Sequence, residues 1–238
     1  MSDLRRFFVD EIKEPLVIEG EEFRHATSVL RIKEGEQIIV CDNSGLEYVC
    51  NVEKISKNNL QASISEHRKS SSEATENVLL ICGYLKGDKT ELVVQKAVEL
   101  GIKEIVVFNS EFCSAYMNDN KLNRLNRVSV ESAKQCGRAI APKVVYINTF
   151  EKALNYAKDY VNKLFACEFA DRNQMDFKSL KGSTAIVVGS EGGFSKYESQ
   201  LATEKGYQTV FLGKRILRAE TASIALCSIV MHSLGELE

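Results

Sequence analysis

Between residues 37 and 64, apolar and polar positions follow a period of two, and the apolar runs are separated by polar segments at 42–45 and 57–59. Period-two patterning with Asn, Asp, Ser and Gly in the breaks is typical of strands joined by tight turns. We therefore predict a small antiparallel meander in this part of the chain.

A second pattern begins after a polar segment at residues 69–76, Lys-Ser-Ser-Ser-Glu-Ala-Thr-Glu, in which alanine is the largest apolar residue. Such a composition is typical of a linker. We place the domain boundary here, with one domain at residues 1–72 and the other at residues 73–238.

Beyond this linker, short apolar runs alternate with segments of helical periodicity. The predicted strands are 78–84, 104–109, 143–147, 163–169, 184–189 and 208–211, and the predicted helices are 89–100, 122–138, 150–160, 196–205 and 221–234. This alternation predicts an α/β domain with a parallel sheet covered on both faces. Ligands bind such sheets beyond the carboxyl ends of the strands, so the loops after Tyr84, Phe169, Gly189 and Phe211 are the expected site.

The overall composition narrows the class of protein. The 238 residues are 44% hydrophobic and 27% charged, with a formal net charge of −2. This balance is ordinary for a globular protein and excludes disordered and collagen-like chains. Because the net charge is slightly negative, the protein has no overall positive field, and a nucleic acid would have to bind a local basic patch.

The cysteines and the short apolar runs indicate a cytoplasmic protein. Seven cysteines are an odd number in a chain too long to need disulfide bonds, so we expect them to be reduced. No two have C-x-x-C spacing and the three histidines are scattered, so we expect no metal site. No apolar run is long enough to span a bilayer, so we expect no membrane partner.

One segment approaches a nucleotide-binding motif. Residues 83–90 fit G-x-x-x-x-G-K-T except at the second glycine, which is Asp88. A carboxylate beside Lys89 would narrow the backbone conformations and repel a phosphate. We therefore favour an interpretation in which Asp88 caps the following helix while Lys86 and Lys89 are solvated. A P-loop-like nucleotide hydrolase is the alternative.

The predicted helix at 122–138 carries a basic stripe opposite an apolar one, at about 100° per residue. RNA phosphates would bind such a stripe, and a solvated charged face has the same pattern. The candidate RNA-binding residues are Arg124, Arg127, Lys134 and Arg138.

Two turns near the C-terminus carry more glycine and charge than packing requires. The first is Gly189-Ser-Glu-Gly-Gly-Phe194, which precedes a helix with the expected N-cap Ser195. Its glycines allow positive φ and a close approach of the backbone to a ligand. The second, at residues 213–222, places several charges between buried elements. We expect the two turns to form one ligand site.

These turns resemble the signature of a known enzyme family. Residues 189–195 with Glu198, followed by 212–222, are similar to the paired motifs of the ribosomal small subunit methyltransferase E family. The likeness extends over nearly the whole chain, through Arg6-Phe-Phe-Val9, His25 with Val29-Leu-Arg31 and Gly35, Gln95-Lys-Ala97 with Glu99-Leu-Gly101, and Gln135 with Arg138 and Pro142. Enzymes of this family methylate N3 of one uridine in 16S ribosomal RNA, with S-adenosylmethionine as the methyl donor.

The resemblance implies a SPOUT-type α/β domain with a trefoil knot, preceded by a PUA-like β-barrel. It also implies a homodimer that uses S-adenosylmethionine and acts on 16S ribosomal RNA within the small ribosomal subunit. The cofactor-binding residues that it implies are Glu168, Gly189, Glu191, Gly192, Leu212, Gly213, Ile216, Leu217, Thr221 and Ala222.

The chain departs from the family pattern at four positions. Ser190 and Lys214 stand where proline is usual, and Ala219 where threonine is common. Cys113 stands where arginine is common, which weakens the expectation of a phosphate contact near residue 113.

Methyl transfer to uridine N3 needs positioning and charge more than covalent help. Because N3 carries a proton, a cation such as Arg138 or Arg218 would favour the deprotonated base. We predict these two arginines as the catalytic residues, with Arg138 on the RNA side. Glu191 or Glu220 could accept the proton, and the sequence does not decide which of them is the general base. An ion pair of Arg218 with Glu220, within one chain or between subunits, is the structural alternative.

A non-catalytic RNA-binding assembly factor on the same fold is a further hypothesis. The intact glycines of both turns disfavour it.

Overall fold

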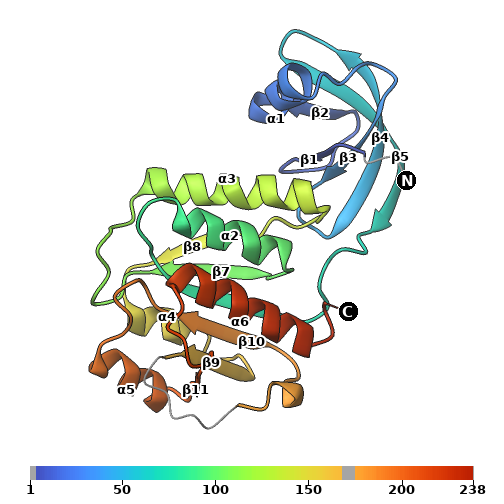
Figure 1. The fold of residues 1–238 in the computed structure, drawn as a ribbon. Helices are drawn as coiled ribbons and strands as arrows, with labels where there is room; N and C mark the ends of the chain where they lie inside the picture. Colours follow the sequence, from blue (N-terminus) through green and yellow to red (C-terminus); the bar gives the residue numbers. More distant parts are fainter. Residues whose placement is uncertain (1–3, 168–174, 238) are drawn as a thin grey trace. The chain divides into compact units, whose positions relative to one another are not determined.

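The chain folds into two units, each of which is described by itself. The structure is a computed structural model that describes residues 4–167 and 175–237 (Figure 1). The first unit comprises Met1–Glu73 and Val130–Ala141, and the second comprises Ala74–Ser129 and Pro142–Glu238. Residues 130–141 thus pack with the N-terminal part of the chain, whereas the sequence pattern assigns them to the second domain.

A five-stranded sheet forms the first unit, in the order β1-β3-β4-β5-β2. Its antiparallel centre, β3 to β5, confirms the predicted meander, and β1 pairs with β3 in parallel. The buried side chains on its covered face include Phe7, Ile18, Ile38 and Leu60. The strands are β1 (Arg6–Phe8), β2 (Leu16–Glu19), β3 (Gln37–Cys41), β4 (Leu46–Ile55) and β5 (Asn59–Lys69).

Three short elements of this unit were not predicted. They are β1, β2 and the helix α1 (Gly20–Arg24), which continues into a π-helical turn (His25–Val29). Runs of three to five residues are too short to reveal a period, so the pattern alone could not identify them.

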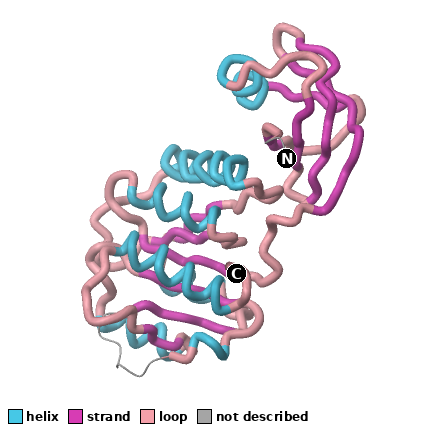
Figure 2. Tube along the Cα trace, turned by 45° about the vertical axis from the view of Figure 1, so that its right-hand side comes forward, coloured by secondary structure: helices cyan, strands magenta, loops and turns pink. Residues whose placement is uncertain are grey.

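The second unit contains a six-stranded parallel sheet in the order β11-β9-β10-β6-β7-β8 (Figure 2). All its neighbouring strands pair in parallel, which confirms the predicted α/β fold class. The strands are β6 (Val78–Gly83), β7 (Glu104–Phe108), β8 (Val144–Ile147), β9 (Asn162–Ala166), β10 (Thr184–Val188) and β11 (Gln208–Val210). The trefoil knot implied by the family resemblance stays a prediction.

Helices cover both faces of this parallel sheet. On one face, α2 (Lys89–Glu99) packs against α6 (Ala219–Ser233), which lies on β6 and β10 (Figure 1). On the other face, α4 (Phe150–Tyr156) packs against α5 (Lys196–Glu204) and covers β7 and β8. The helix α3 (Asp119–Cys136) begins in this unit, and its last residues belong to the first unit.

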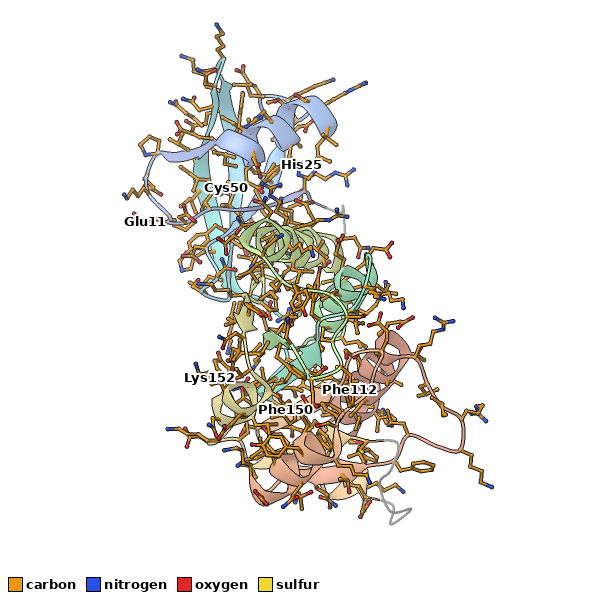
Figure 3. All side chains as sticks on the ribbon, turned by 90° about the vertical axis from the view of Figure 1, so that its left-hand side faces the viewer. Glu11, His25, Cys50, Phe112, Phe150 and Lys152 are labelled. Carbon is orange, nitrogen blue, oxygen red and sulfur yellow. The ribbon has the colours of Figure 1, made fainter. Side chains whose placement is uncertain are left out.

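A cluster of phenylalanine rings beneath α4 fixes the end of the first glycine-rich turn. The Phe194 ring lies 4.4 Å from the Phe165 ring and 5.3 Å from the Phe150 ring, centroid to centroid (Phe150 is labelled in Figure 3). Directly after it, Ser195 and Glu198 form a capping box that starts α5. The turn after β10 is therefore held at its far end by both packing and capping.

A single carboxylate ties the C-terminal turn to the start of the second unit. Glu236 accepts hydrogen bonds from the Thr75 amide at 2.7 Å, the Thr75 hydroxyl at 2.6 Å and the Glu76 amide at 2.7 Å. Burial alone would raise the pKa of Glu236, but these hydrogen bonds outweigh it and hold the pKa below its usual value. Such a group stabilises the fold above its unfolded pKa, and this contribution is lost as the pH falls through its folded pKa.

We predict that Glu236→Gln lowers the free energy of unfolding by about 1 kcal/mol at pH 7, because charge-assisted hydrogen bonds become neutral ones. Urea unfolding of the variant and the parent at pH 7 and at pH 3 checks this. The difference should shrink at pH 3, because the contribution of the charged carboxylate is lost progressively as the pH falls below the unfolded pKa toward the folded pKa of Glu236. The exposed Asp159, replaced by Asn, serves as the control and should change little. A Glu236→Gln difference of equal size at both pH values would contradict the prediction.

Candidate cofactor site

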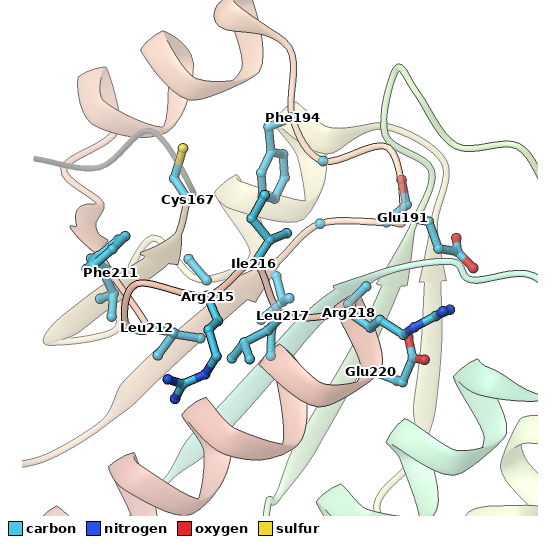
Figure 4. Close-up of a pocket in the computed structure, with 18 of the residues that line it drawn as sticks. Cys167, Glu191, Phe194, Phe211, Leu212, Arg215, Ile216, Leu217, Arg218 and Glu220 are labelled. Atoms are coloured by element: carbon cyan, nitrogen blue, oxygen red, sulfur yellow. The ribbon is translucent and has the colours of Figure 1, made fainter.

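The two glycine-rich turns line one cavity of about 660 Å³ beyond the carboxyl ends of β9, β10 and β11 (Figure 4). Its walls are the turn after β10, the segment between β11 and α6, the end of β9, and Lys89 from the start of α2. The four neighbouring strands β11, β9, β10 and β6 run in the same direction, so the segments that follow them emerge at one edge. Cavities of about 300–1,000 Å³ are typical of small-molecule sites.

Eight of the ten cofactor residues implied by the resemblance line this cavity. They are Gly189, Glu191, Gly192, Leu212, Gly213, Ile216, Leu217 and Ala222. Thr221 is not among the lining residues, and Glu168 lies outside the described residues. Of the two predicted catalytic arginines, Arg218 lines the cavity and Arg138 does not.

Sequence reasoning missed several residues of the cavity wall. Ala166 and Cys167 lie at the end of β9, which stops at Ala166, three residues earlier than the predicted strand. Val210 and Phe211 come from the end of β11, and Lys89 comes from the motif that was read as structural. For the residues at the ends of β9 and β11, the strand ends were the available signal, because each of them ends or directly follows a parallel strand.

Two of the glycines are required because other residues occupy the space of a side chain. A Cβ atom at Gly192 would lie 2.6 Å from the Phe112 Cβ and 2.8 Å from its carbonyl oxygen. A Cβ atom at Gly189 would lie 2.9 Å from the Phe194 ring. The turn thus presents bare backbone to the cavity while its other side is closely packed.

Glu191 is held by the loop that follows β6. Its Oε1 accepts hydrogen bonds from the Lys86 amide and the Lys89 ammonium, each at 3.1 Å. Burial would raise the pKa of Glu191, but donors that include the backbone amides of Glu191 and Lys86 and the ammonium of Lys89 outweigh it and lower the pKa. A carboxylate with a lowered pKa is a poor proton acceptor at neutral pH, which disfavours Glu191 as the general base.

The same contacts revise the interpretation of residues 83–90. Asp88 occupies the N-cap position of α2 but makes no side-chain capping hydrogen bond, so the predicted cap is wrong. Lys86 is exposed, as expected, whereas Lys89 is only partly exposed and pairs with Glu191. Because the Lys86 amide also points at this carboxylate, the loop binds a protein anion where a P-loop would bind a phosphate.

Arg218 and Glu220 have no partners of their own in the described part of the chain. No hydrogen bond or ion pair joins either side chain to a described residue, and the Glu220 Oε2 atom is buried without a hydrogen-bond donor. Figure 4 shows the two side chains beside each other at the start of α6. The ion pair between Arg218 and Glu220 that we considered within one chain is therefore not formed.

The cavity suits a ligand with both apolar and charged parts. Ile216 lines it with 85% of its surface exposed, which leaves apolar area for a bound molecule to cover. Four cations (Lys89, Lys214, Arg215 and Arg218) and two carboxylates (Glu191 and Glu220) also line it. S-adenosylmethionine, with a base, hydroxyls, a carboxylate and an ammonium group, fits this combination and the bare glycine backbone.

The four candidate RNA-binding residues lie in different environments. Arg124 is largely exposed and pairs with Glu91 at 2.7 Å, and Arg127 is exposed. Lys134 is 7% exposed and pairs with Glu22 at 2.6 Å. Arg138 follows the end of α3, because Gly137 with φ +81° comes directly after Cys136.

Arg138 forms a buried ion pair with Glu73 within the first unit. Its side chain is 2% exposed, and its guanidinium donates to Glu73 Oε2 at 2.9 and 3.1 Å. Glu73 Oε1 accepts hydrogen bonds from the amides of Ala139 and Ile140 at 2.8 and 2.9 Å. These contacts secure residues 138–140 to the end of the N-terminal segment.

Neither a metal cluster nor a membrane span was found within residues 4–167 and 175–237. No group of three or more His, Cys, Asp or Glu residues there could hold a metal ion. No helix in that part of the chain is long and apolar enough to cross a membrane.

Two family models match the chain. A model described as an RNA methyltransferase domain matches residues 72–231, which include the whole cavity wall. A model described as an RNA methyltransferase PUA domain matches residues 18–65, within the five-stranded sheet unit.

Individual relatives cover nearly the whole chain. The ribosomal RNA small subunit methyltransferase E of Mesomycoplasma hyopneumoniae is 34% identical over 224 residues, which are 93% of this chain and 96% of the relative. The protein of the same name from Bacillus subtilis is 30% identical over 247 residues, 96% of each chain. A crystal structure of the protein of this name from Neisseria gonorrhoeae, bound to S-adenosyl methionine, has a TM-score of 0.87 and 28% identity, covering 97% of this chain and 98% of that one.

We predict that Gly192→Ala weakens the binding of S-adenosylhomocysteine about tenfold or more, because the added methyl group must displace Phe112 or the turn. Isothermal titration calorimetry on the full chain measures this. Gly206→Ala is the matched control, since Gly206 has φ +81° and no atom within 4 Å of an added Cβ. It should lower stability by roughly 1 kcal/mol and leave the affinity unchanged. An unchanged affinity for Gly192→Ala would contradict the prediction.

We also predict that Arg138→Met destabilises the protein by about 3 kcal/mol, since it leaves the Glu73 carboxylate buried without its cation. Denaturant unfolding provides the measurement. Arg124→Met, which removes an exposed ion pair of α3, should cost no more than about 0.5 kcal/mol. If Arg138→Met unfolded like the parent and lost only methyl transfer, the structural role of Arg138 would be contradicted. A catalytic role would then be favoured.

Proposed function

The chain belongs to the ribosomal RNA small subunit methyltransferase E family, and we propose on this basis that it transfers a methyl group from S-adenosylmethionine to N3 of a specific uridine in 16S ribosomal RNA. The observation that carries the proposal is the cavity between the two glycine-rich turns, which is built from residues of both signature motifs. The family-wide match supports the reaction class, and the cavity supports the cofactor.

The residues that would hold the cofactor are the lining residues of the two turns. Gly189 and Gly192 offer backbone that a ligand can approach closely, and Leu212, Ile216 and Leu217 offer apolar surface. When bound, S-adenosylmethionine supplies an electrophilic methyl group on its sulfonium. Thr221 and Glu168, which the resemblance also implies, stay predictions.

Arg218 is the residue that we propose for activation of the uridine. N3 of uracil has an available electron pair only after it loses its proton, and a nearby guanidinium favours the resulting anion. Arg218 suits this role because its charge is not used by any described residue and its side chain lines the cavity. Arg138, which is committed to Glu73, acts as a structural residue in this proposal.

Glu220 is our proposal for the group that accepts the N3 proton. Of the two carboxylates in the cavity, Glu191 is bonded to Lys86 and Lys89, whereas the buried Glu220 Oε2 has no hydrogen-bond donor in the described part of the chain. A carboxylate can accept a proton directly or through one water.

The RNA partner and the assembly follow from the family. We propose that the substrate is 16S ribosomal RNA, within the small ribosomal subunit, and that the protein acts in the cytoplasm as a homodimer. Arg124 and Arg127 are the exposed candidates for phosphate contacts, whereas Lys134 and Arg138 are engaged in buried pairs.

Mass spectrometry of nucleosides from 16S ribosomal RNA tests the function. Cells that lack this protein should lose N3-methyluridine at one position, and the parent gene should restore it. Retention of the modified nucleoside without the protein would overturn the proposal.

The proposed role of Arg218 gives a prediction for the same system. Arg218→Gln should reduce kcat about 100-fold or more while the affinity for S-adenosylhomocysteine stays within a few-fold of the parent. Lys152→Gln, a change at an exposed cation outside the cavity, is the control and should retain turnover. Equal kcat values for Arg218→Gln and the parent would exclude the role.

A further inference from the structure

Phe112 is an apolar residue left half-exposed at the edge of the cofactor site. It lies in the loop after β7, and its exposed fraction is 50% (Figure 3). Exposed large apolar residues are common in proteins and by themselves need no explanation. The surroundings of Phe112 are what distinguish it.

The residues on both sides of Phe112 are fixed by hydrogen bonds. The Ser110 hydroxyl is 2.9 Å from the Ser190 hydroxyl, and both serines are buried. The Cys113 thiol donates to the Tyr84 carbonyl at 3.0 Å. The loop is therefore held to the turn after β10 on one side of Phe112 and to the end of β6 on the other.

A buried carboxylate adds a third attachment next to Phe112. Glu198 is 4% exposed, and its Oε1 accepts a hydrogen bond from the Glu111 amide at 2.9 Å. Its other oxygen accepts the Ser195 amide in the capping box of α5. Both oxygens are thus used to keep the loop and the glycine-rich turn in one arrangement.

Phe112 also packs directly on a residue of the cofactor cavity. Its Cβ and carbonyl oxygen occupy the space next to Gly192, where an added Cβ would meet them at 2.6 and 2.8 Å. Phe112 therefore lies directly against Gly192, a residue of the wall that would hold the methyl donor, although Phe112 itself does not line the cavity. An anchored, exposed ring at this position is preorganised to bind a flat group.

We propose that the Phe112 ring is a stacking surface for a nucleobase of the RNA strand that enters the site. The proposal rests on the proposed function, since it concerns how the same RNA is held. Single-stranded RNA is commonly bound by stacking of bases on aromatic side chains, worth roughly 1–3 kcal/mol per base. The cavity that Gly192 lines carries four cations and two carboxylates, and this excess of positive charge complements the phosphates of the same strand.

The test compares Phe112→Leu, Phe112→Trp and the parent in two binding measurements with the full chain. The first is the dissociation constant for a 16S ribosomal RNA transcript, and the second is the dissociation constant for S-adenosylhomocysteine. Phe112→Leu should weaken RNA binding about tenfold, Phe112→Trp should restore it, and the affinity for S-adenosylhomocysteine should not change. Tyr197→Leu, a change at an aromatic residue of α5 that is 68% exposed and does not line the cavity, is the control and should bind RNA like the parent.

Three results would overturn the proposal. Unchanged RNA affinity for Phe112→Leu would remove the stacking role, and a loss confined to S-adenosylhomocysteine would assign the ring to the cofactor. A shift of the variant toward a smaller species in sedimentation would assign the ring to a subunit interface. RNA affinity and methyl transfer are separate measurements. The RNA affinity of the variants tests the stacking proposal, whereas a failure of methyl transfer by the parent would contradict the proposed function.

Discussion

The site depends on a close approach of backbone to backbone at the carboxyl edge of the parallel sheet. A Cβ atom at Gly83, the last residue of β6, would lie 2.5 Å from the Ser190 amide nitrogen and 2.9 Å from the Gly189 carbonyl carbon. Only a residue without a side chain lets the turn after β10 pass this closely over its neighbouring strand. The turn is thereby pressed against β6, and the space on its other side is left for the segment between β11 and α6.

The polar groups around this turn divide into those that hold it and those that remain open. Glu191 is bonded to Lys86 and Lys89, and Glu198 joins the loop after β7 to the capping box of α5. By contrast, Arg218 and Glu220 face the cavity without partners among the described residues. The turn is thus held in place by Glu191 and Glu198, while Arg218 and Glu220 have no protein partner among the described residues. This arrangement is expected of a site whose ligand or substrate supplies the missing contacts.

The sequence pattern predicted the long elements well and the local contacts poorly. All six strands of the parallel sheet were predicted, because each is an apolar run next to a helical segment. The pattern could not reveal that residues 130–141 pack with the first unit, since periodicity identifies a buried face and not the element that covers it. Arg138 illustrates the consequence: helical spacing assigns it to a solvent-facing stripe, but the chain leaves the helix at Gly137 and Arg138 pairs with Glu73. For the cavity, the glycine spacing identified the correct turns. Cys167 and Phe211 could be assigned to the cavity wall only once the order of the strands was known.

We propose that one small molecule bridges two turns that are separated in sequence by the whole of α5 and β11. Amide hydrogen exchange of the full chain, recorded with and without S-adenosylhomocysteine, tests it most directly. If one ligand bridges them, protection should rise together in residues 189–194 and 212–218 at the same ligand concentration. Protection confined to one of these turns, or centred on the loop at residues 85–89, would contradict it.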